Sequence, residues 1–279
     1  MRPVDKWDPQ HHATIKATYT HYQDAKPDLD RNLGTMCSYC EKAYADERDL
    51  QVEHIQPKKY KDATGNYIYA HLETAWSNFL LSCPTCNGQD NKDTKNVVYG
   101  QCHLPHLNNT FLSLCYKAGG VVEVNPALTG TSAANARVLL ELVGLDKGPD
   151  DSCPTDHRWQ IRSRNWDLAS RYQKMYAARD VKLETIIDLA KARGCWSIWF
   201  TVFRGHDEVR EALIRAFPGT AASCFDARDH YDPIPRNPPD FVNASPKLRF
   251  AVSKFKKRLY GKVLLCQEES FCKERTIFG

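Results

Sequence analysis

The sequence contains no apolar run long enough to cross a membrane, and its mean hydropathy is -0.56. Residues Met1 to Lys6 contain no apolar core of the kind that secretory signal peptides carry. Internal repeats and low-complexity segments are also missing. We therefore expect a globular protein of the cytoplasm that does not associate with membranes.

A strong excess of charge of one sign is missing too. The chain has 38 lysines and arginines against 34 aspartates and glutamates, a formal net charge of +4. This balance permits a nucleic-acid partner without requiring one. With 42% hydrophobic and 26% charged residues over 279 positions, the composition is that of a folded chain of one large or two ordinary domains. We therefore do not expect a disordered polypeptide, because the chain can bury a sizeable core.

Cysteine, by contrast, is abundant, with 11 residues. In a cytosolic chain of this size, paired cysteines indicate a metal site rather than disulfides. Two Cys-x-x-Cys pairs are present, Cys37/Cys40 and Cys83/Cys86. The remaining cysteines share no such spacing, and we interpret them as buried small hydrophobic residues or inert thiols. These are Cys102, Cys115, Cys153, Cys195, Cys224, Cys266 and Cys272.

Each Cys-x-x-Cys turn places two thiolates close together, and two such turns complete the tetrahedral sulfur site that zinc favours. The 42 residues between Cys40 and Cys83 must then form a folded insert that the metal holds at its base. The alternatives are four unrelated buried thiols or a redox Cys-x-x-Cys motif. A redox motif needs only one pair, so the sequence favours a structural Zn2+ bound by Cys37, Cys40, Cys83 and Cys86.

Hydrophobic periodicity and turn residues predict a mixture of short strands and longer helices. The expected strands are 52–55, which Pro57 ends, and 121–124, which follows a pair of glycines. The expected helices are 10–24, before breaks at Pro27 and Gly34, then 133–143, a helical pattern through 167–193, and 207–217. Residues 196–203 are so apolar that they must be buried, and we assign most of them to an ordinary core. Residues 230–246 are expected to form an extended loop, and 247–262 a basic helix or arm.

The insert between the cysteine pairs holds the residues of greatest chemical interest. Glu53 and His54 are neighbours on the expected strand, where their side chains should point to opposite faces. A histidine beside a glutamate is ordinarily a surface residue or a satisfied core residue. Two asparagines near the second cysteine pair favour a catalytic role for His54. Asn78 lies five residues before Cys83, and Asn87 follows Cys86 directly. We expect zinc to fix Asn87 at the start of a helix and to aim it at the strand.

Glu53-His54, Asn78 and Asn87 together resemble the signature of the HNH endonucleases. That signature is an acidic residue and a histidine on a first strand, a middle asparagine, and a histidine or asparagine nine residues later. Asn87 lies nine residues after Asn78. The resemblance implies that His54 is the general base and that Asn78 completes the catalytic set by holding the loop that carries His54. It also implies that Glu53 and Asn87 bind a catalytic Mg2+ or Mn2+.

The chemistry agrees with these residue types. A neutral imidazole can take a proton from water near pH 7, and a hard divalent ion prefers oxygen ligands. Lys58, Lys59 and Lys92 are candidates for contacts with nucleic acid, Lys92 by its displaced match to a lysine of the family. For Lys58 and Lys59 the competing interpretation is two solvated lysines after a proline.

The resemblance predicts an α+β, mostly helical fold with a ββα-metal (HNH) core, a four-cysteine zinc staple and a helical C-terminal region. The expected division is an N-terminal arm and helix in 1–36, the nuclease core in 37–100, and a helical region in 101–279. The alternative function is a zinc-stapled module that binds nucleic acid or a partner without catalysis. The alternative substrate is RNA such as tRNA.

Residues 1–6, 52–58, 76–87 and 217–220 together also resemble the B subunits of Septu-type anti-phage systems, some of which are encoded beside retrons. That resemblance implies an ATPase partner of the SMC/ABC type. A retron setting would add a reverse transcriptase and its msDNA as partners. The basic segment 247–262 could then bind nucleic acid, an acidic surface of the ATPase, or solvent alone.

Overall fold

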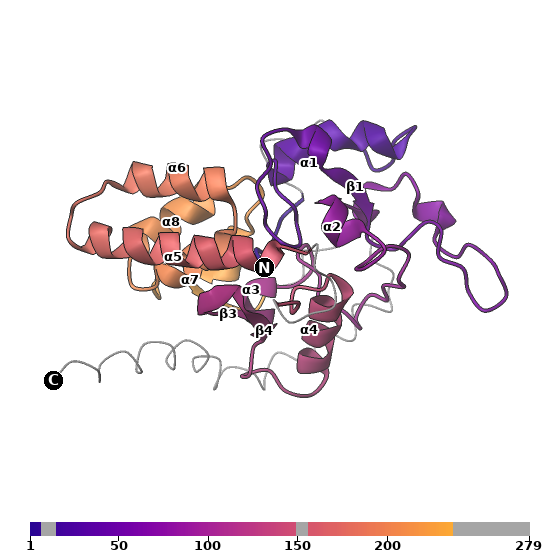
Figure 1. Cartoon of the computed structure of the whole chain (residues 1–279). Coiled ribbons are helices and arrows are strands. Elements are labelled where there is room, and N and C mark those ends of the chain that lie inside the picture. Colours follow the sequence, from indigo (N-terminus) through magenta and orange to yellow (C-terminus); the bar gives the residue numbers. More distant parts are fainter. Residues whose placement is uncertain (7–14, 149–155, 237–279) are drawn as a thin grey trace.

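A computed structural model of the chain describes residues 1–6, 15–148 and 156–236. The helices are α1 (Lys26–Leu33), α2 (Pro84–Asn87), α3 (Thr110–Ser113), α4 (Gly130–Leu142), α5 (Arg158–Ala177), α6 (Leu183–Arg193), α7 (Trp196–Val202) and α8 (Asp207–Ala216). The strands are β1 (Gln51–His54), β2 (Phe79–Ser82), β3 (Leu114–Tyr116), β4 (Val122–Val124), β5 (Phe225–Asp226) and β6 (Asp232–Pro233). Helices α5 to α8 gather on one side of the molecule, and β1, α1 and α2 lie on the other (Figure 1).

The hairpin of β1 and β2 is the frame of the insert between the cysteine pairs. The strands are antiparallel, with Gln51 opposite Ser82 and His54 opposite Phe79. All four residues of β2 are buried, because α1 packs against this strand and the hairpin faces the core. Helix α2 follows β2 directly and packs against β1, which completes a ββα unit. The expected strand at 52–55 is confirmed, displaced by one residue.

The helix expected over 10–24 is wrong over residues 15–21, and only its end is helical, in the short 3-10 helix Tyr22–Ala25 that leads into α1. Residues 15–21 are irregular and Thr18 forms a bridge with Ala75, while residues 10–14 lie outside the described residues. The helix α1 begins later because Pro27 occupies its first turn, where the missing N–H costs nothing. Pro27 therefore starts a helix instead of breaking one. Gly34 ends α1 with a φ of 75°.

The middle of the chain forms a second hairpin and a helix. Strand β3 pairs with β4, which confirms the strand expected after the glycines. Helix α4 packs against β4 and begins three residues before the expected start at Ala133. Gly144, with a φ of 58°, follows its end as expected.

The helical side is built around α7, whose side chains are almost all buried. Trp196 and Phe200 stack with ring centroids 4.5 Å apart, and the Arg210 guanidinium lies 4.2 Å from the centroid of the Phe200 ring. The assignment of this apolar stretch to the core is confirmed. The helix expected at 207–217 is confirmed as α8. The helical pattern through 167–193 is two helices, α5 and α6, and α5 begins earlier than expected.

The helical side meets the hairpin side at the residue that follows Cys40. Glu41 is buried, and its carboxylate accepts hydrogen bonds from the Ser197 hydroxyl at 2.7 Å and the Ser197 N–H at 2.9 Å. Gly194 approaches so closely that a Cβ there would lie 2.4 Å from the Glu41 carbonyl oxygen. Among the described residues, one hydrophobic core takes side chains from all three expected regions of the chain.

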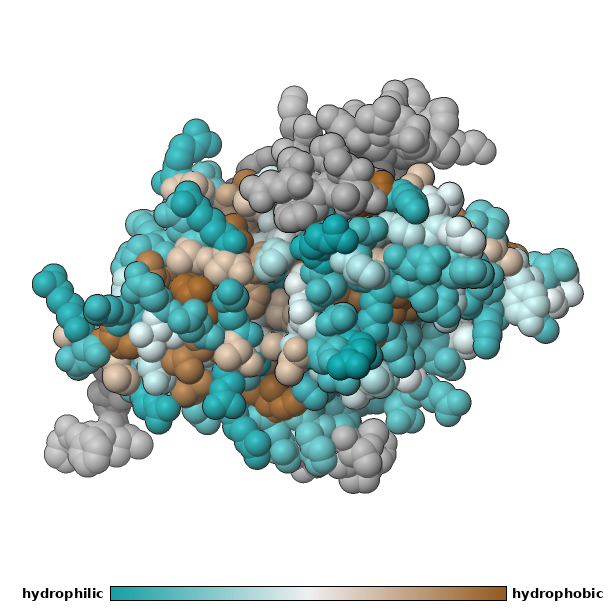
Figure 2. All heavy atoms as spheres, turned by 90° about the horizontal axis from the view of Figure 1, so that it is seen from above, coloured by the Kyte–Doolittle hydropathy of each residue, from teal (hydrophilic) through white to brown (hydrophobic). Residues whose placement is uncertain are grey.

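The surface is largely hydrophilic in the view of Figure 2, with apolar patches between polar side chains on the helical side. A search of the described residues finds no helix with the length and apolar character needed to span a bilayer.

Candidate metal and nuclease site

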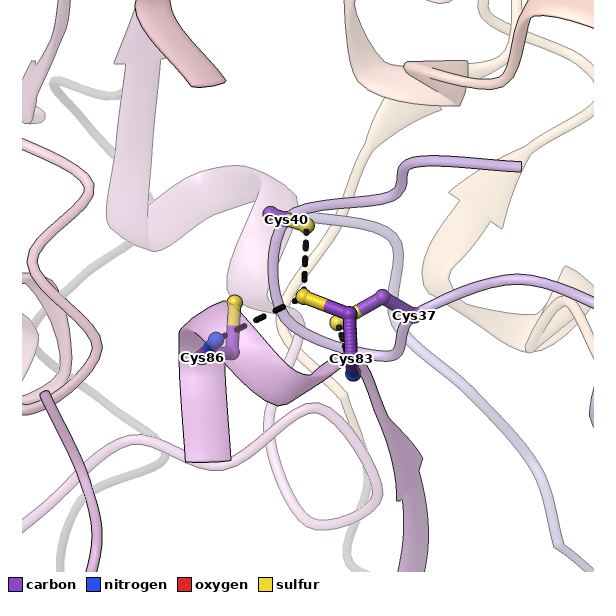
Figure 3. Close-up of side chains that lie close together, drawn as sticks. All are labelled: Cys37, Cys40, Cys83 and Cys86. Carbon is purple, nitrogen blue, oxygen red and sulfur yellow. Dashed lines mark hydrogen bonds between the residues drawn. The ribbon is translucent and has the colours of Figure 1, made fainter. Parts of the chain in front are cut away.

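Four cysteine sulfur atoms converge where the Cys37–Cys40 turn meets the end of β2 and the start of α2 (Figure 3). All four side chains are buried, and their Sγ atoms lie within 4.8 Å of one another. They are the one group of this kind that the described part of the chain contains. The predicted convergence of Cys37, Cys40, Cys83 and Cys86 is confirmed.

The geometry of this cluster fits a zinc ion. The Sγ atoms of Cys40 and Cys83 are 3.7 Å apart. With zinc–sulfur bonds of about 2.3 Å, the edge of a sulfur tetrahedron is about 3.8 Å. Backbone N–H groups also donate to sulfur, that of Cys83 to Cys37 and that of Cys86 to Cys83. Donors aimed at sulfur favour thiolates, the form that binds metal.

Arg158, the first residue of α5, brings a positive charge to the cluster. Its Nη1 donates to the Cys86 Sγ at 3.0 Å, although the two residues are 72 positions apart. The guanidinium is also bound to the Asp156 carboxylate and to the carbonyl oxygens of Val143 and Gly144. Four thiolates around Zn2+ carry a net charge of -2, so a buried arginine offsets part of it.

His54 stands at the end of β1, and its ring is fixed from three sides. Its Nε2 lies 2.8 Å from the carbonyl oxygen of Glu73. Because a carbonyl only accepts, Nε2 carries the hydrogen, and Nδ1 is the basic atom of the neutral ring. Tyr22 and Phe79 contact the ring edge to face, with centroids 4.9 Å and 5.3 Å away. Burial, which outweighs the hydrogen bond to Glu73, lowers the pKa of His54 and favours the neutral form.

Asn78 holds the turn that follows His54. Its Oδ1 accepts from the backbone N–H of Gln56 at 2.8 Å, and its Nδ2 donates to the Gln56 carbonyl at 2.9 Å. Its own carbonyl accepts from the N–H of Ile55 at 2.9 Å. The side chain is fully buried, so these bonds are shielded from water. This arrangement suits a positioning residue.

Glu53 points away from His54, toward the interior. Its carboxylate is 2.7 Å from the Nζ of Lys92, and both side chains are 1% exposed. The Tyr39 hydroxyl donates to the same carboxylate at 3.3 Å, and Lys92 also donates to the His54 carbonyl at 2.7 Å. Burial alone raises the pKa of Glu53, and the Lys92 charge opposes that rise. The carboxylate is thus enclosed by protein groups.

Asn87 does not start a helix, contrary to expectation, but ends α2. Cys83 caps that helix and Pro84 occupies its first turn, so the helix begins before Asn87. The half-buried side chain donates from Nδ2 to the Gln51 side chain at 2.9 Å. Gln51 and Glu53 share one face of β1, so Asn87 and Glu53 belong to the same side of the hairpin.

The oxygen donors do not form a ready cation site in this arrangement. A hard divalent ion needs exposed oxygens and open positions for water or phosphate. Glu53 is buried and neutralised by Lys92, while the Asn87 amide is bonded to Gln51. The roles of Glu53 and Asn87 as ligands of Mg2+ or Mn2+ stay predictions.

Of the three lysines expected to contact nucleic acid, Lys92 needs correction, because its ammonium is buried against Glu53. Lys58 lies at the surface, 2.5 Å from the Glu73 carboxylate and 4.0 Å from the centroid of the Tyr22 ring. Lys59 is exposed. Only Lys58 and Lys59 remain as candidates, and their contacts with nucleic acid stay predictions.

Several residues of the site carry no signal in the sequence. Lys6 is buried and donates to the carbonyl oxygens of Trp76, Ser77 and Phe79, where it supports the turn that leads into β2. Burial lowers the pKa of Lys6 to about 7. Arg158 and Glu73 likewise act across long stretches of sequence, and no local spacing could have revealed them.

This part of the chain thus combines a β-hairpin and a short helix with four converging cysteines and a histidine fixed at the end of β1. Residues 37–93 match the family model of the HNH endonucleases. This segment, which contains both cysteine pairs, His54, Asn78 and Asn87, is therefore an HNH domain.

One curated relative is a protein of Vibrio cholerae serotype O1 biovar El Tor that carries the provisional name of retron Vc95 HNH endonuclease. It is 35% identical to this chain over 121 residues. The match covers 41% of this chain and spans about half of the relative, 53% of its length.

Proposed function

We propose that the chain is a metal-dependent HNH endonuclease that hydrolyses phosphodiester bonds of nucleic acid, with DNA as the favoured substrate. The observation that carries the proposal is His54. The Glu73 carbonyl fixes its Nε2–H, burial favours its neutral form, and it lies within the segment that matches the HNH family. Zn2+ on the four cysteines has a structural role in this proposal, and Mg2+ or Mn2+ is the catalytic ion.

His54 acts as the general base. Its Nδ1 takes a proton from water while the water oxygen bonds to phosphorus, and the bond from phosphorus to the leaving oxygen breaks. The leaving oxygen then takes a proton from solvent. Asn78 fixes the backbone of the turn that follows His54, because its side chain binds both the N–H and the carbonyl of Gln56. A divalent ion, for which Glu53 and Asn87 are the expected ligands, would stabilise charge on the phosphoryl group.

The test is cleavage of supercoiled plasmid and of structured RNA by the full chain with Mg2+ or Mn2+. We expect His54→Ala to lower the rate by about 10²- to 10⁴-fold, the usual contribution of a general base. His71 is exposed in the loop between β1 and β2, so His71→Ala is the matched control and should cleave like wild type. Equal activity of wild type and His54→Ala would contradict the assignment. If only RNA is cleaved, RNA replaces DNA as the proposed substrate.

A second candidate is a zinc-stapled binding module without catalysis. The burial of Glu53 against Lys92 favours it, since it leaves the proposed metal ligand engaged. This candidate requires that wild-type protein bind nucleic acid and cleave neither substrate at any divalent-ion concentration.

We further propose that the nuclease is the effector of an anti-phage complex with an ATPase subunit of the SMC/ABC type. The support is the match to a relative named for a retron, together with the sequence resemblance to Septu-type B subunits. Co-purification with the product of the neighbouring gene tests this role. Where a retron is present, the test includes co-purification with its reverse transcriptase and msDNA. Recovery of the chain alone from phage-infected cells would count against a complex.

A further inference from the structure

Lys6 is a buried cation whose side chain ends beside the turn that carries Asn78. The residue is 4% exposed. Its ammonium donates to the carbonyl oxygens of Trp76, Ser77 and Phe79 at 3.0, 2.8 and 3.0 Å. An ammonium has three donors, so each carbonyl can receive one of them. These hydrogen bonds offset part of the cost of burying the charge.

The three carbonyl groups belong to residues on both sides of Asn78. The Asn78 carbonyl itself accepts from the Ile55 N–H at 2.9 Å, and its side chain binds both the N–H and the carbonyl of Gln56. Asn78 therefore contacts the turn that follows His54, while its neighbours in the chain are held by Lys6. The backbone on which Asn78 depends is thus fixed by a residue from another part of the sequence.

The backbone directly before Lys6 is anchored away from the hairpin. The Val4 N–H donates to the Pro105 carbonyl at 2.7 Å, and the Asp5 N–H donates to the Gly219 carbonyl at 2.7 Å. The N-terminus lies between the helical side and the hairpin side in the view of Figure 1. Lys6 therefore reaches the turn of Asn78 from a fixed backbone, which a surface lysine lacks.

We propose that Lys6 is a positioning residue of the nuclease, because its ammonium fixes the turn of Asn78 and thereby the strand end that carries His54. The proposal rests on the proposed function, in which His54 takes a proton from water and Asn78 holds the turn beside it. Lys6 acts through Asn78 and has no part in the proton transfer itself.

Loss of the Lys6 ammonium leaves three buried carbonyl groups short of a donor. Buried carbonyls need partners, so this backbone must shift or take up water. Asn78 then holds the turn after His54 less firmly. A general base must lie within hydrogen-bond reach of the attacking water, so a small displacement of His54 lowers the rate of cleavage.

The first experiment compares amide hydrogen exchange in the zinc-loaded full chain and in Lys6→Met. The N–H groups of Ile55 and Gln56 bond to Asn78, so they report directly on the turn. We expect both to exchange at least about tenfold faster in the variant. The Lys117 N–H, which is bonded within the other hairpin, is the internal reference and should not change. Wild-type exchange at both positions in folded Lys6→Met would overturn the proposal.

The second experiment separates positioning from stability. Single-turnover cleavage and the Kd for nucleic acid are measured per zinc-loaded chain, and Lys6→Met should lower the rate at least about tenfold with an unchanged Kd. Arg210→Met is the matched control, because Arg210 is also a buried cation and donates to the His230 carbonyl and to Asp232 on the helical side. It should lose stability but cleave like wild type. Equal loss of rate in both variants would limit Lys6 to a structural role.

A second variant keeps the proposal testable if Lys6→Met does not fold. Lys6→Gln retains a polar side chain, but its amide has only two N–H donors for three carbonyls. We expect the same changes in exchange and cleavage rate, each by a smaller factor than in Lys6→Met. Wild-type exchange at Ile55 and Gln56 together with wild-type cleavage in Lys6→Gln would contradict the proposal.

The exchange measurement does not depend on cleavage. If exchange rises in Lys6→Met but wild type cleaves neither plasmid nor RNA, Lys6 holds the turn and the proposed nuclease activity is wrong. If cleavage depends on His54 but Lys6→Met cleaves like wild type, the nuclease stands and the positioning role of Lys6 is wrong.

Discussion

The cysteine cluster and the hairpin differ in how far the side chains that we propose to bind an ion are arranged for it in the folded chain. At the cysteine cluster, four sulfur atoms converge, and N–H groups and the Arg158 guanidinium already face them. On the hairpin, the carboxylate and amide expected to bind a second ion are engaged with Lys92 and Gln51. The first position needs only an ion, whereas the second needs a rearrangement of side chains.

This difference agrees with the roles that we propose for the two ions. A structural metal contributes to folding, so its ligands must be assembled whenever the chain is folded. A catalytic ion must exchange and accept phosphate oxygens, so its site needs open positions. At Glu53 the folded chain offers no open position, because the Lys92 ammonium binds the buried carboxylate. Substitutions in the cysteine cluster should therefore act mainly on folding, and substitutions on the hairpin mainly on cleavage.

The largest expected effect is on the cysteine cluster. Cys83→Ser should abolish stoichiometric zinc and unfold residues 37–93, because a structural zinc contributes about 10 kcal/mol or more to folding. Limited proteolysis with metal analysis measures both. Cys102→Ser is the matched control, since Cys102 is buried outside the cluster and should keep zinc and protease resistance. Unchanged protease resistance of Cys83→Ser would show that zinc does not hold this segment.

On the hairpin, Asn78→Ala should lower the cleavage rate on the order of a hundredfold while the chain stays folded. The substitution leaves the Gln56 N–H and carbonyl without their partner and frees the turn beside His54. The stability cost should be about 1–3 kcal/mol. Asn125→Ala is the control, because Asn125 is also buried and bonds the Leu112 carbonyl and the Ala127 N–H far from the hairpin. Equal loss of cleavage in both variants would make the effect one of stability alone.

A smaller effect is expected from Arg158→Met, which removes the charge that faces Cys86. Outer contacts of this kind typically change metal affinity by about 10- to 100-fold. Competition with a chromogenic chelator measures the change, with the exposed Arg164→Met on the same helix as control. If Arg158→Met retains zinc as wild type does, Arg158 does not affect the affinity for zinc. Its role is then limited to its hydrogen bonds with Asp156 and the carbonyl oxygens.

The smallest effect concerns the two surface lysines after the strand, Lys58 and the more exposed Lys59. Lys59→Met should weaken binding of nucleic acid uniformly across sequences and reduce the slope of log Kd against log salt by about 0.9, one phosphate contact. Lys58 is held by Glu73 and Tyr22, so Lys58→Met should change the slope less. Fluorescence anisotropy over a salt series gives both slopes. Identical slopes in wild type and both variants would remove these lysines from the interface.

The sequence predicts the parts of the site whose signals are local. The Cys-x-x-Cys spacings and the short strand that carries His54 are contiguous patterns, and the structure confirms the convergence of the cysteines and the strand. Helices α4 and α8 were predictable from apolar spacing and from the glycine or proline after them.

The remaining features depend on long-range packing, which spacing cannot reveal. Lys92 meets His54 across 38 residues and Arg158 meets Cys86 across 72, so neither partner could be inferred from neighbouring positions. A lysine near the motif suggests contact with phosphate, and only the fold shows that its ammonium is buried. The same limit applies to Pro27, because a proline can end one helix or occupy the first turn of the next, and tertiary packing decides between them.

The most direct test of the two-ion account is to dialyse the full chain against EDTA and to measure metal content and plasmid cleavage on the same sample. We expect one zinc per chain to remain, cleavage to disappear, and added Mg2+ to restore cleavage in wild type but not in His54→Ala. Cleavage that persists after EDTA with no divalent ion other than zinc, or that returns equally in His54→Ala, would contradict the account.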